Sequence, residues 1–287
     1  MPRGLAQGTQ NLIAAAAAIL ARIQPATVRG VCYQLFNHKL IPDMSRNSTQ
    51  KMSRILVQAR ERDIIPWAWI VDETRPVELV SSWSDPERYM QAVIRSYRRD
   101  RWADQPERVM VVSEKGTVGG VIRPITEQYG VPFLVCHGFG SATALHDLAD
   151  RSVSDPRPLV ILYVGDHDPS GRYMSDFDLA ERLDRYDGLA TIERVAVTEE
   201  QMEDYDLLTF PAHEKKTDAR HPWFVNHYGQ TCCELDAHNP NDLRQLVEDA
   251  ILDHLDWDLW DRAEEIQEVE MTSIEDFIRS WPGVASA

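Results

Sequence analysis

The sequence predicts an α/β protein with an N-terminal winged helix-turn-helix domain, a parallel, Rossmann-like sheet domain and a C-terminal helical extension. Three observations support this fold class. Helix signals dominate residues 9–63, strand-length apolar runs alternate with helical stretches after residue 107, and apolar residues recur at helical spacing over 243–255. Alternating strands and helices are typical of a parallel, doubly wound sheet.

The composition is that of a globular protein, with 43% hydrophobic and 26% charged residues in a chain of 287. This length accommodates two domains, which we place at residues 1–80 and 106–287, joined by a basic connecting helix within 81–105. The four cysteines form no CxxC pair, so neither a zinc site nor a disulfide framework is indicated. We expect a reducing, cytoplasmic location, associated with the nucleoid. No apolar segment is long enough to cross a bilayer, so we expect no membrane partner.

The charge of the chain is unevenly distributed. The net charge of −16 argues against a protein coated in nucleic acid, because phosphate binding requires Lys and Arg. Residues 1–105 nevertheless carry a net charge of +5, whereas the remainder carries −21. This asymmetry indicates that the first third contacts a polyanion. The alternative is that the acidity only keeps the protein soluble.

The N-terminal elements follow the order of a winged helix. We expect a helix over 10–22, a second that starts after Thr27 as its N-cap, and a third in "STQKMSRILVQARERD". In the third, one apolar face is formed at i, i+3, i+4 and i+7 by Met52, Ile55, Leu56 and Ala59. The segment "IIPWAWIVDETR" then reads as strand, turn and strand, which completes the winged-helix order.

The third helix also carries basic residues, as a groove-reading helix does. Lys51 and Arg54 lie mostly off its apolar face, and we take them as DNA-binding candidates. A small helical domain with a solvated basic face is the alternative. The arginine-rich stretch 86–102 is predicted to be the helix that connects the two domains.

Four apolar runs predict the strands of the sheet: "RVMVV", "PFLVC", "LVILYV" and "IERVAV". Helical stretches are expected between them, at 117–129, 141–150 and 171–186. The first strand ends in "SEKG" with Glu114, the second in "HGFGS" with Gly138, and the third in "GDHDPSG" with Asp166 and Asp168. In parallel sheets the functional residues follow the carboxyl ends of the strands.

Glu114, Asp166 and Asp168 are therefore expected to converge on one edge of the sheet. Hard oxygen ligands suit Mg²⁺, with Mn²⁺ as the alternative ion. The DxD pattern alone is weak, because glycosyltransferases use a similar motif, and the joint placement at two strand ends gives it weight. We expect His167 to face solvent. The stretch 213–220 is expected to be a surface loop, with phosphate contact by Lys215 and Lys216 as the alternative.

These motifs resemble those of the Toprim domain, and within it the family of the topoisomerase VI A subunit and the meiotic double-strand-break transesterase. "VVSEKG" and "YVGDHDPSG" are similar to the Glu and DxD segments of that family, and "CHGFGS" and "CELDAHNPNDLRQLV" are similar to two further segments. In the N-terminal part, "TVRGVCYQLF" places Arg29 and Tyr33 where the family has an Arg and the nucleophilic Tyr. Cys32 and Ser113 depart from the pattern.

The resemblance implies a winged helix followed by a Toprim domain that cleaves DNA by Mg²⁺-dependent tyrosine transesterification. It implies Tyr33 as nucleophile, Arg29 as phosphate ligand, Lys115 as a further DNA contact, and the three carboxylates as metal ligands. It also implies a homodimer, in which the tyrosine of one subunit faces the metal site of the other, and a separate ATPase subunit for strand passage.

Three alternatives stay open at this point. Water, rather than Tyr33, can be the nucleophile, which makes the protein a hydrolytic nuclease. The chain can be a non-catalytic, nucleic-acid-binding component of a larger complex, and Tyr33 can be an ordinary core tyrosine. The sequence does not distinguish DNA from RNA as the substrate.

Overall fold

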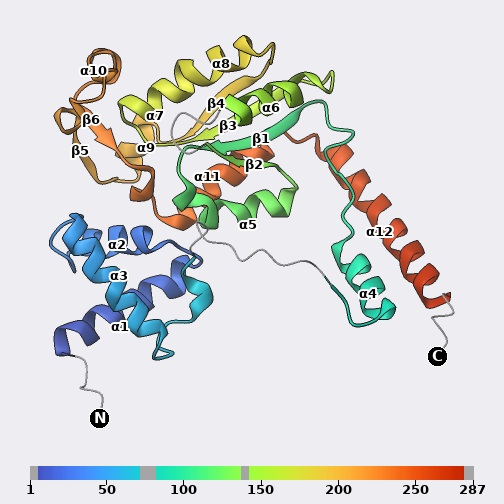
Figure 1. Ribbon diagram of the computed structural model, residues 1–287, viewed down its shortest axis with the longest axis horizontal. Coiled ribbons are helices and arrows are strands. Elements are labelled where there is room, and N and C mark those ends of the chain that lie inside the picture. Colours follow the sequence, from blue (N-terminus) through green and yellow to red (C-terminus); the bar gives the residue numbers. More distant parts are fainter. Residues whose placement is uncertain (1–5, 72–81, 137–141, 281–287) are drawn as a thin grey trace.

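The computed structural model describes residues 6–71, 82–136 and 142–280. Its elements fall into three groups (Figure 1). Three helices form the N-terminal group, a parallel sheet covered by helices forms the centre, and two helices lie side by side as an arm at the far side. The predicted α/β class with a parallel sheet is confirmed.

The N-terminal group consists of α1 (Gln7–Ile23), α2 (Val28–Asn37) and α3 (Arg46–Arg60). The hydroxyl of Thr27 accepts a hydrogen bond from the Gly30 N–H and starts α2, as predicted, and Ser45 caps α3 in the same way. The predicted apolar face of α3 is buried in the core that the three helices share. Lys51 and Arg54 are exposed, as a binding face requires.

The predicted hairpin after α3 is wrong in its first strand. Residues Trp67–Trp69 form a 3₁₀ turn, and Ile70 makes a single parallel bridge with Ala26. Pro66 explains the difference, because it has no N–H to give to a strand and its carbonyl accepts the turn's hydrogen bond from Trp69. The second strand of the hairpin lies mostly outside the described residues.

The central sheet has four parallel strands in the order β2-β1-β3-β4. They are β1 (Arg108–Ser113), β2 (Phe133–Val135), β3 (Leu159–Val164) and β4 (Thr191–Ala196), and all four were predicted. β1 and β3 pair over their whole length, with Ser113 opposite Val164. This register brings the residues that follow the two strands, Glu114 and Gly165, to the same edge of the sheet.

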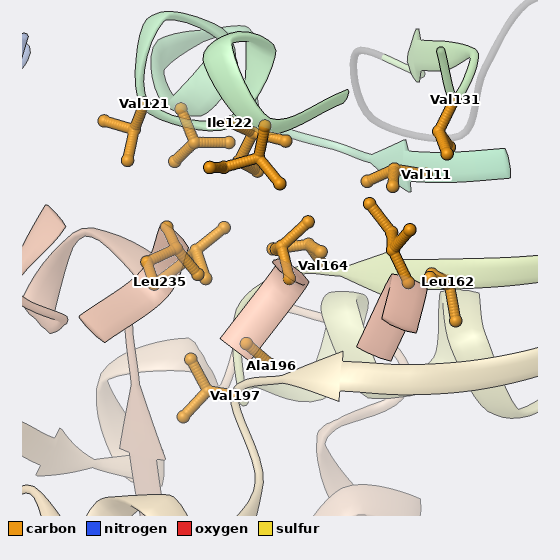
Figure 2. Close-up of a cluster of buried hydrophobic side chains, with 14 of the residues drawn as sticks. Val111, Val121, Ile122, Val131, Leu162, Val164, Ala196, Val197 and Leu235 are labelled. Carbon is orange, nitrogen blue, oxygen red and sulfur yellow. The ribbon is translucent and has the colours of Figure 1, made fainter. Parts of the chain in front are cut away.

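Helices cover both faces of this sheet, so that β1 and β3 are almost fully buried. One face packs against α5 (Gly119–Tyr129) and α11 (Pro240–Leu252), and Figure 2 shows Val121 and Ile122 of α5 above Val111, Leu162 and Val164 of the strands. The other face packs against α6 (Ala142–Val153) and α8 (Leu179–Arg185). The short helix α7 (Pro169–Tyr173) and a π-helical turn precede α8.

A second, two-stranded sheet was not predicted. Its antiparallel strands are β5 (Thr209–Pro211) and β6 (Thr231–Cys233), and α9 (Glu199–Asp204) and α10 (His221–Tyr228) flank β5 and precede β6. Cys233 is bridged to His167, and each backbone N–H donates to the carbonyl of the other residue at 2.8 and 2.9 Å. The small sheet is thereby tied to the loop that follows β3.

The arm consists of α4 (Pro86–Ser96) and α12 (Trp257–Ser280) (Figure 1). The connecting helix predicted over 86–102 is shorter than expected, because the chain is not helical at 97–100. In the described parts of the chain, no helix has both the length and the apolar character needed to cross a membrane.

Candidate functional site

The three predicted carboxylates lie at the carboxyl edge of the central sheet. Glu114 follows β1, and Asp166 and Asp168 follow β3. Burial, together with the negative charges of Asp166 and Asp168, raises the pKa of Glu114 to about 7. Side chains from two strand ends therefore interact electrostatically, as expected from the sequence.

Two groups of the chain bind one carboxylate oxygen of Asp166. This oxygen accepts a hydrogen bond from the backbone N–H of Leu235 at 2.7 Å and forms an ion pair with the Lys115 ammonium group, also at 2.7 Å. The side chain is buried, and this burial raises its pKa despite the nearby ammonium group. Leu235 follows β6, so the small sheet helps to fix the first aspartate of the DxD motif.

Asp168 is the N-cap of α7. One carboxylate oxygen accepts from the N–H groups of Ser170 and Gly171 at 3.0 and 2.8 Å, and the other pairs with Lys215 at 2.9 Å. Although burial alone acts in the opposite direction, the Gly171 and Lys215 hydrogen bonds lower the pKa of Asp168. The carboxylate is thus ionised and oriented by its own helix.

Gly171 allows α7 to pass close to the loop. A Cβ atom at this position would overlap the backbone of Asp166, including its carbonyl oxygen. The glycine of "DPSG" is therefore required by packing around the aspartates, rather than by an unusual backbone angle.

Arg194 of β4 binds the same loop through hydrogen bonds, and the sequence analysis did not predict this role. Its guanidinium donates to the carbonyl oxygens of Gly165, Asp166 and Gly171 at 3.1, 3.3 and 2.6 Å. Burial lowers the pKa of Arg194 to about 10, so it remains charged at neutral pH. The sequence feature that could have indicated this role is an arginine within the predicted strand "IERVAV".

A second pair of carboxylates, Glu234 and Asp236, follows β6. Lys115 lies between them and Asp166, with its ammonium 3.5 Å from Glu234 and 3.2 Å from Asp236. Arg29 of α2 pairs with both carboxylates from the other side, and its Nε is 3.4 Å from Asp236. The sequence pointed to this segment only through "CELDA", and gave neither residue a role. Lys115, expected to contact DNA, belongs to this network.

Tyr33 lies beside the network in the same chain. It is 5% exposed and packs in the core cluster that contains Leu235 and Ala237. Glu234 is near enough for its charge to act on the Tyr33 hydroxyl, and the Arg29 guanidinium lies 5.6 Å from the Tyr33 ring centre. Burial and the Glu234 charge raise its pKa well above that of a free tyrosine. The tyrosine is therefore a core residue and also a neighbour of the acidic site.

A cleft of about 540 Å³ opens between the N-terminal helices and β5. Arg29, Tyr33, Lys215 and Glu234 contribute to its walls, so it reaches from the tyrosine to the lysine that holds Asp168. Lys215, which we expected to lie in a surface loop with phosphate contact as the alternative, is thus part of the site. Its segment is a short 3₁₀ helix, Ala212–Lys215, directly after β5.

The donor set fits Mg²⁺ in chemical type, because Glu114, Asp166 and Asp168 offer only carboxylate oxygens. Burial and then the charges of Asp166 and Asp168 raise the pKa of Glu114, and a divalent cation would relieve this repulsion between the carboxylates. The side chains are not arranged as a cage, however. Among residues 6–71, 82–136 and 142–280, no group of three or more His, Cys, Asp or Glu side chains is placed to hold a metal ion. Lys115 and Lys215 instead neutralise the two aspartates.

Two further expectations concern the strand-end loops. Gly138, in the second strand-end motif, lies outside the described residues. His167 does not face solvent, as we expected, but is fully buried against Phe224 and Tyr228 at 5.3 and 5.5 Å between ring centres. The backbone bridge between His167 and Cys233 accompanies a position of the His167 ring against α10, which the sequence did not predict.

Comparisons with protein-family models and with curated proteins find no match to this chain. The resemblance to the Toprim and topoisomerase VI A families therefore depends on the motifs quoted above.

Proposed function

We propose that the protein cleaves the DNA backbone by metal-dependent transesterification, with Tyr33 as the nucleophile. One observation carries this proposal: Tyr33 and Arg29 line a cleft together with Lys215, which contacts Asp168. A tyrosine, an arginine and the lysine that pairs with Asp168 thus line one cleft, and the DxD carboxylates lie behind that lysine, outside the cleft lining. The order of three N-terminal helices and then a parallel sheet agrees with a winged-helix and Toprim architecture.

In the proposed reaction, the Tyr33 oxygen forms a bond to a backbone phosphorus, and the bond from that phosphorus to a sugar oxygen breaks. The phenol proton passes to the neighbouring Glu234 carboxylate, and the released sugar oxygen takes up a proton from water. Arg29 and Lys215 would bind the non-bridging phosphate oxygens from the cleft walls. Glu114, Asp166 and Asp168 would hold Mg²⁺, or Mn²⁺, which supplies electrostatic stabilisation of the phosphate charge.

In the described arrangement, Tyr33 is not activated as a nucleophile. Lys115 and Arg29, acting against burial, lower the pKa of Glu234, which makes this neighbouring carboxylate a weak base. The pKa of Tyr33 itself is raised. A phosphate that takes Arg29 from Glu234 would raise the pKa of Glu234 and make it a better acceptor for the Tyr33 proton, so substrate binding and activation of the nucleophile are linked in the proposal.

A hydrolytic nuclease is the second candidate function, and the burial of Tyr33 favours it. With Tyr33 only 5% exposed, water in the same cleft would be the more accessible nucleophile. Tyr33 would then serve only in packing.

As further parts of the main proposal, the protein acts as a homodimer in the cytoplasm, at the nucleoid, and associates with a separate ATPase subunit for strand passage. RNA is the alternative substrate.

A plasmid-cleavage assay in Mg²⁺ or Mn²⁺ tests the proposal, with a protease step that reveals protein-linked ends. The wild type should form protein–DNA adducts, and Tyr33→Phe should abolish them while DNA binding is retained. Asp166→Asn should reduce all cleavage by at least ~100-fold, as expected for a few kcal/mol of lost stabilisation. Tyr89→Phe is a matched control, because Tyr89 is 47% exposed on α4, away from the site.

Each alternative gives a different result in this assay. Free ends from both the wild type and Tyr33→Phe would identify the hydrolytic nuclease. Intact plasmid with every variant, together with retained DNA binding, would identify a non-catalytic component. An RNA of the same sequence, cut in place of the plasmid, would move the substrate from DNA to RNA.

A further inference from the structure

Trp67 lies on the surface of the N-terminal group of helices, shortly after α3. It opens the 3₁₀ turn Trp67–Trp69 and is 57% exposed. The turn itself is anchored, because Trp69 packs against the core of the three helices and its carbonyl oxygen accepts a hydrogen bond from the Ala26 N–H at 3.1 Å. Trp67 is therefore an exposed aromatic side chain on a turn that is fixed to the body of the protein.

The Trp67 ring has a cationic neighbour. The guanidinium of Arg60, the last residue of α3, lies over the ring at 4.7 Å from the ring centre. The π electrons attract this cation, so the pair fixes the ring beside the end of the helix. The exposure of the side chain leaves room for another planar group to stack on the ring.

The surroundings of Trp67 are basic, in contrast to the protein as a whole. Helix α3 has four basic side chains and no carboxylate; the four are Arg46, Lys51, Arg54 and Arg60. Glu61, Arg62 and Asp63 follow the helix. The stretch 46–63 thus carries five basic and two acidic side chains, a net charge of +3 in a chain whose net charge is −16. This local charge favours an anionic partner.

A polyanion that also offers planar groups is a nucleic acid. Its phosphates pair with Lys and Arg, and its bases stack on aromatic side chains with little regard to sequence. In a fully paired duplex each base is already stacked between its neighbours, so its faces are closed to Trp67. The side chain can stack on a base that is unpaired, as in a bubble or at a junction of single and double strand.

We propose that Trp67 is a stacking site for an unpaired base of the nucleic acid whose phosphates α3 binds. Lys51 and Arg54 supply an attraction that is the same for every duplex, and Trp67 adds a preference for duplexes with unpaired bases. The inference rests on the proposed function for the identity of the ligand. It involves none of the residues around the carboxylates, so the stacking site and the cleavage site can be tested separately.

Fluorescence anisotropy of end-labelled oligonucleotides with the full chain tests this proposal. Two duplexes share one sequence on the labelled strand, and one of them has a central bubble of unpaired bases. The wild type should bind the bubble about tenfold more tightly, as expected for one stacked base. Trp67→Ala should lose this preference and bind both duplexes as the wild type binds the paired one. Trp67→Phe, which keeps an aromatic face, should retain most of the preference.

Two further variants separate stacking from charge. Trp257→Ala is the matched control, because Trp257 is 49% exposed at the start of α12, and it should leave both affinities unchanged. Lys51→Ala should weaken binding of both duplexes by the same factor, since it removes a phosphate contact. Unchanged affinity of Trp67→Ala for the paired duplex shows that this variant is folded.

Equal affinity of the wild type for the two duplexes would overturn the proposal, and so would a bubble preference that persists in Trp67→Ala. A wild type that binds neither duplex would also overturn it and would indicate a protein as the partner of Trp67. A bubble preference in a protein that cuts no plasmid would count only against the proposed cleavage. Cleavage without the preference would count only against the stacking site.

Discussion

Arg29 of α2 forms an ion pair with Glu234, a residue 205 positions further along the chain. The pair joins the N-terminal helices to the acidic edge of the sheet. Arg244 of α11 reinforces the junction, because its guanidinium donates to the carbonyl oxygens of Ile23, at 3.2 and 3.3 Å, and Pro25. The proposed phosphate ligand is therefore already engaged by a carboxylate of its own chain, and a substrate must compete for it.

Glu234→Gln is predicted to loosen this junction. The amide keeps the shape of the side chain but removes its charge, so Arg29 loses an ionic partner and Tyr33 loses a neighbouring negative charge. Arg29 is 40% exposed, so we expect a stability loss of no more than about 1 kcal/mol. Amide hydrogen exchange in α2 should become faster. Asp85→Asn, which affects the N-cap of α4 and its surface pair with Arg88, should not change exchange in α2. Unaltered exchange in Glu234→Gln would show that the pair does not hold the helices.

Arg194→Lys is predicted to destabilise the DxD loop. A lysine has one ammonium group and cannot reach all the carbonyl oxygens that the guanidinium serves, from Gly165, Asp166 and Gly171 among others. The carbonyl groups of Gly165 and Gly171 keep backbone donors from Val197 and Met174, but the buried Asp166 carbonyl would lose its donor, at a cost of about 1–3 kcal/mol in unfolding free energy. Urea denaturation measures this loss. Arg262→Lys, on the exposed side of α12, should leave the midpoint unchanged.

Gly171→Ala is predicted to displace the loop that carries Asp166. The added methyl group would overlap the Asp166 backbone, which cannot move without disturbing the hydrogen bond from Leu235. We expect a loss of about 1–3 kcal/mol, typical of overpacking. Gly8→Ala is the matched control, because nothing lies within 4 Å of its Cβ position and alanine favours the helix. Thermal unfolding should therefore shift down for the first variant and not for the second. Equal shifts would show that the close approach is not needed.

Acid is predicted to destabilise the protein through two buried histidines. Burial lowers the pKa of His167 and of His238 to about 4. The unfolded chain, with a histidine pKa near 6.5, takes up these protons first, so stability is complete above pH 6.5 and declines as the pH falls toward 4. Each histidine contributes a loss on the order of 3 kcal/mol.

His238→Phe separates this effect from other acid transitions. The ring of His238 is 2% exposed and lies 5.5 Å from that of Tyr205, so a phenyl ring fits the site chemically. Between pH 7 and pH 5 the variant should lose less unfolding free energy than the wild type, because only His167 is then left to take up a proton on unfolding, whereas Glu114 acts in the opposite direction in both proteins. His146→Gln, with a side chain 56% exposed, should not change the slope. A slope that is the same in His238→Phe and the wild type would remove His238 as its cause.

The local elements of this protein were predictable wherever one periodic pattern dominated. The four sheet strands are apolar runs buried on a parallel sheet, and α3 buries its four predicted residues. The 3₁₀ turn at Trp67–Trp69 was missed because its apolar residues read as a strand, although Pro66 opposed it. The three-residue strands β5 and β6 were missed because so short a segment shows no periodicity.

By itself, the sequence determined which carboxylates follow the strand ends, since the pattern of apolar runs fixes where each strand stops. Only the tertiary structure decided their partners: Lys115 and Lys215 on the aspartates, Arg194 beneath the loop, and Glu234 against Arg29 and Tyr33. The physical reason is the separation along the chain of the residues that interact. Strand and helix formation depend on neighbours a few residues apart, whereas a charge network forms between side chains that only the packing of distant elements brings within a few ångströms.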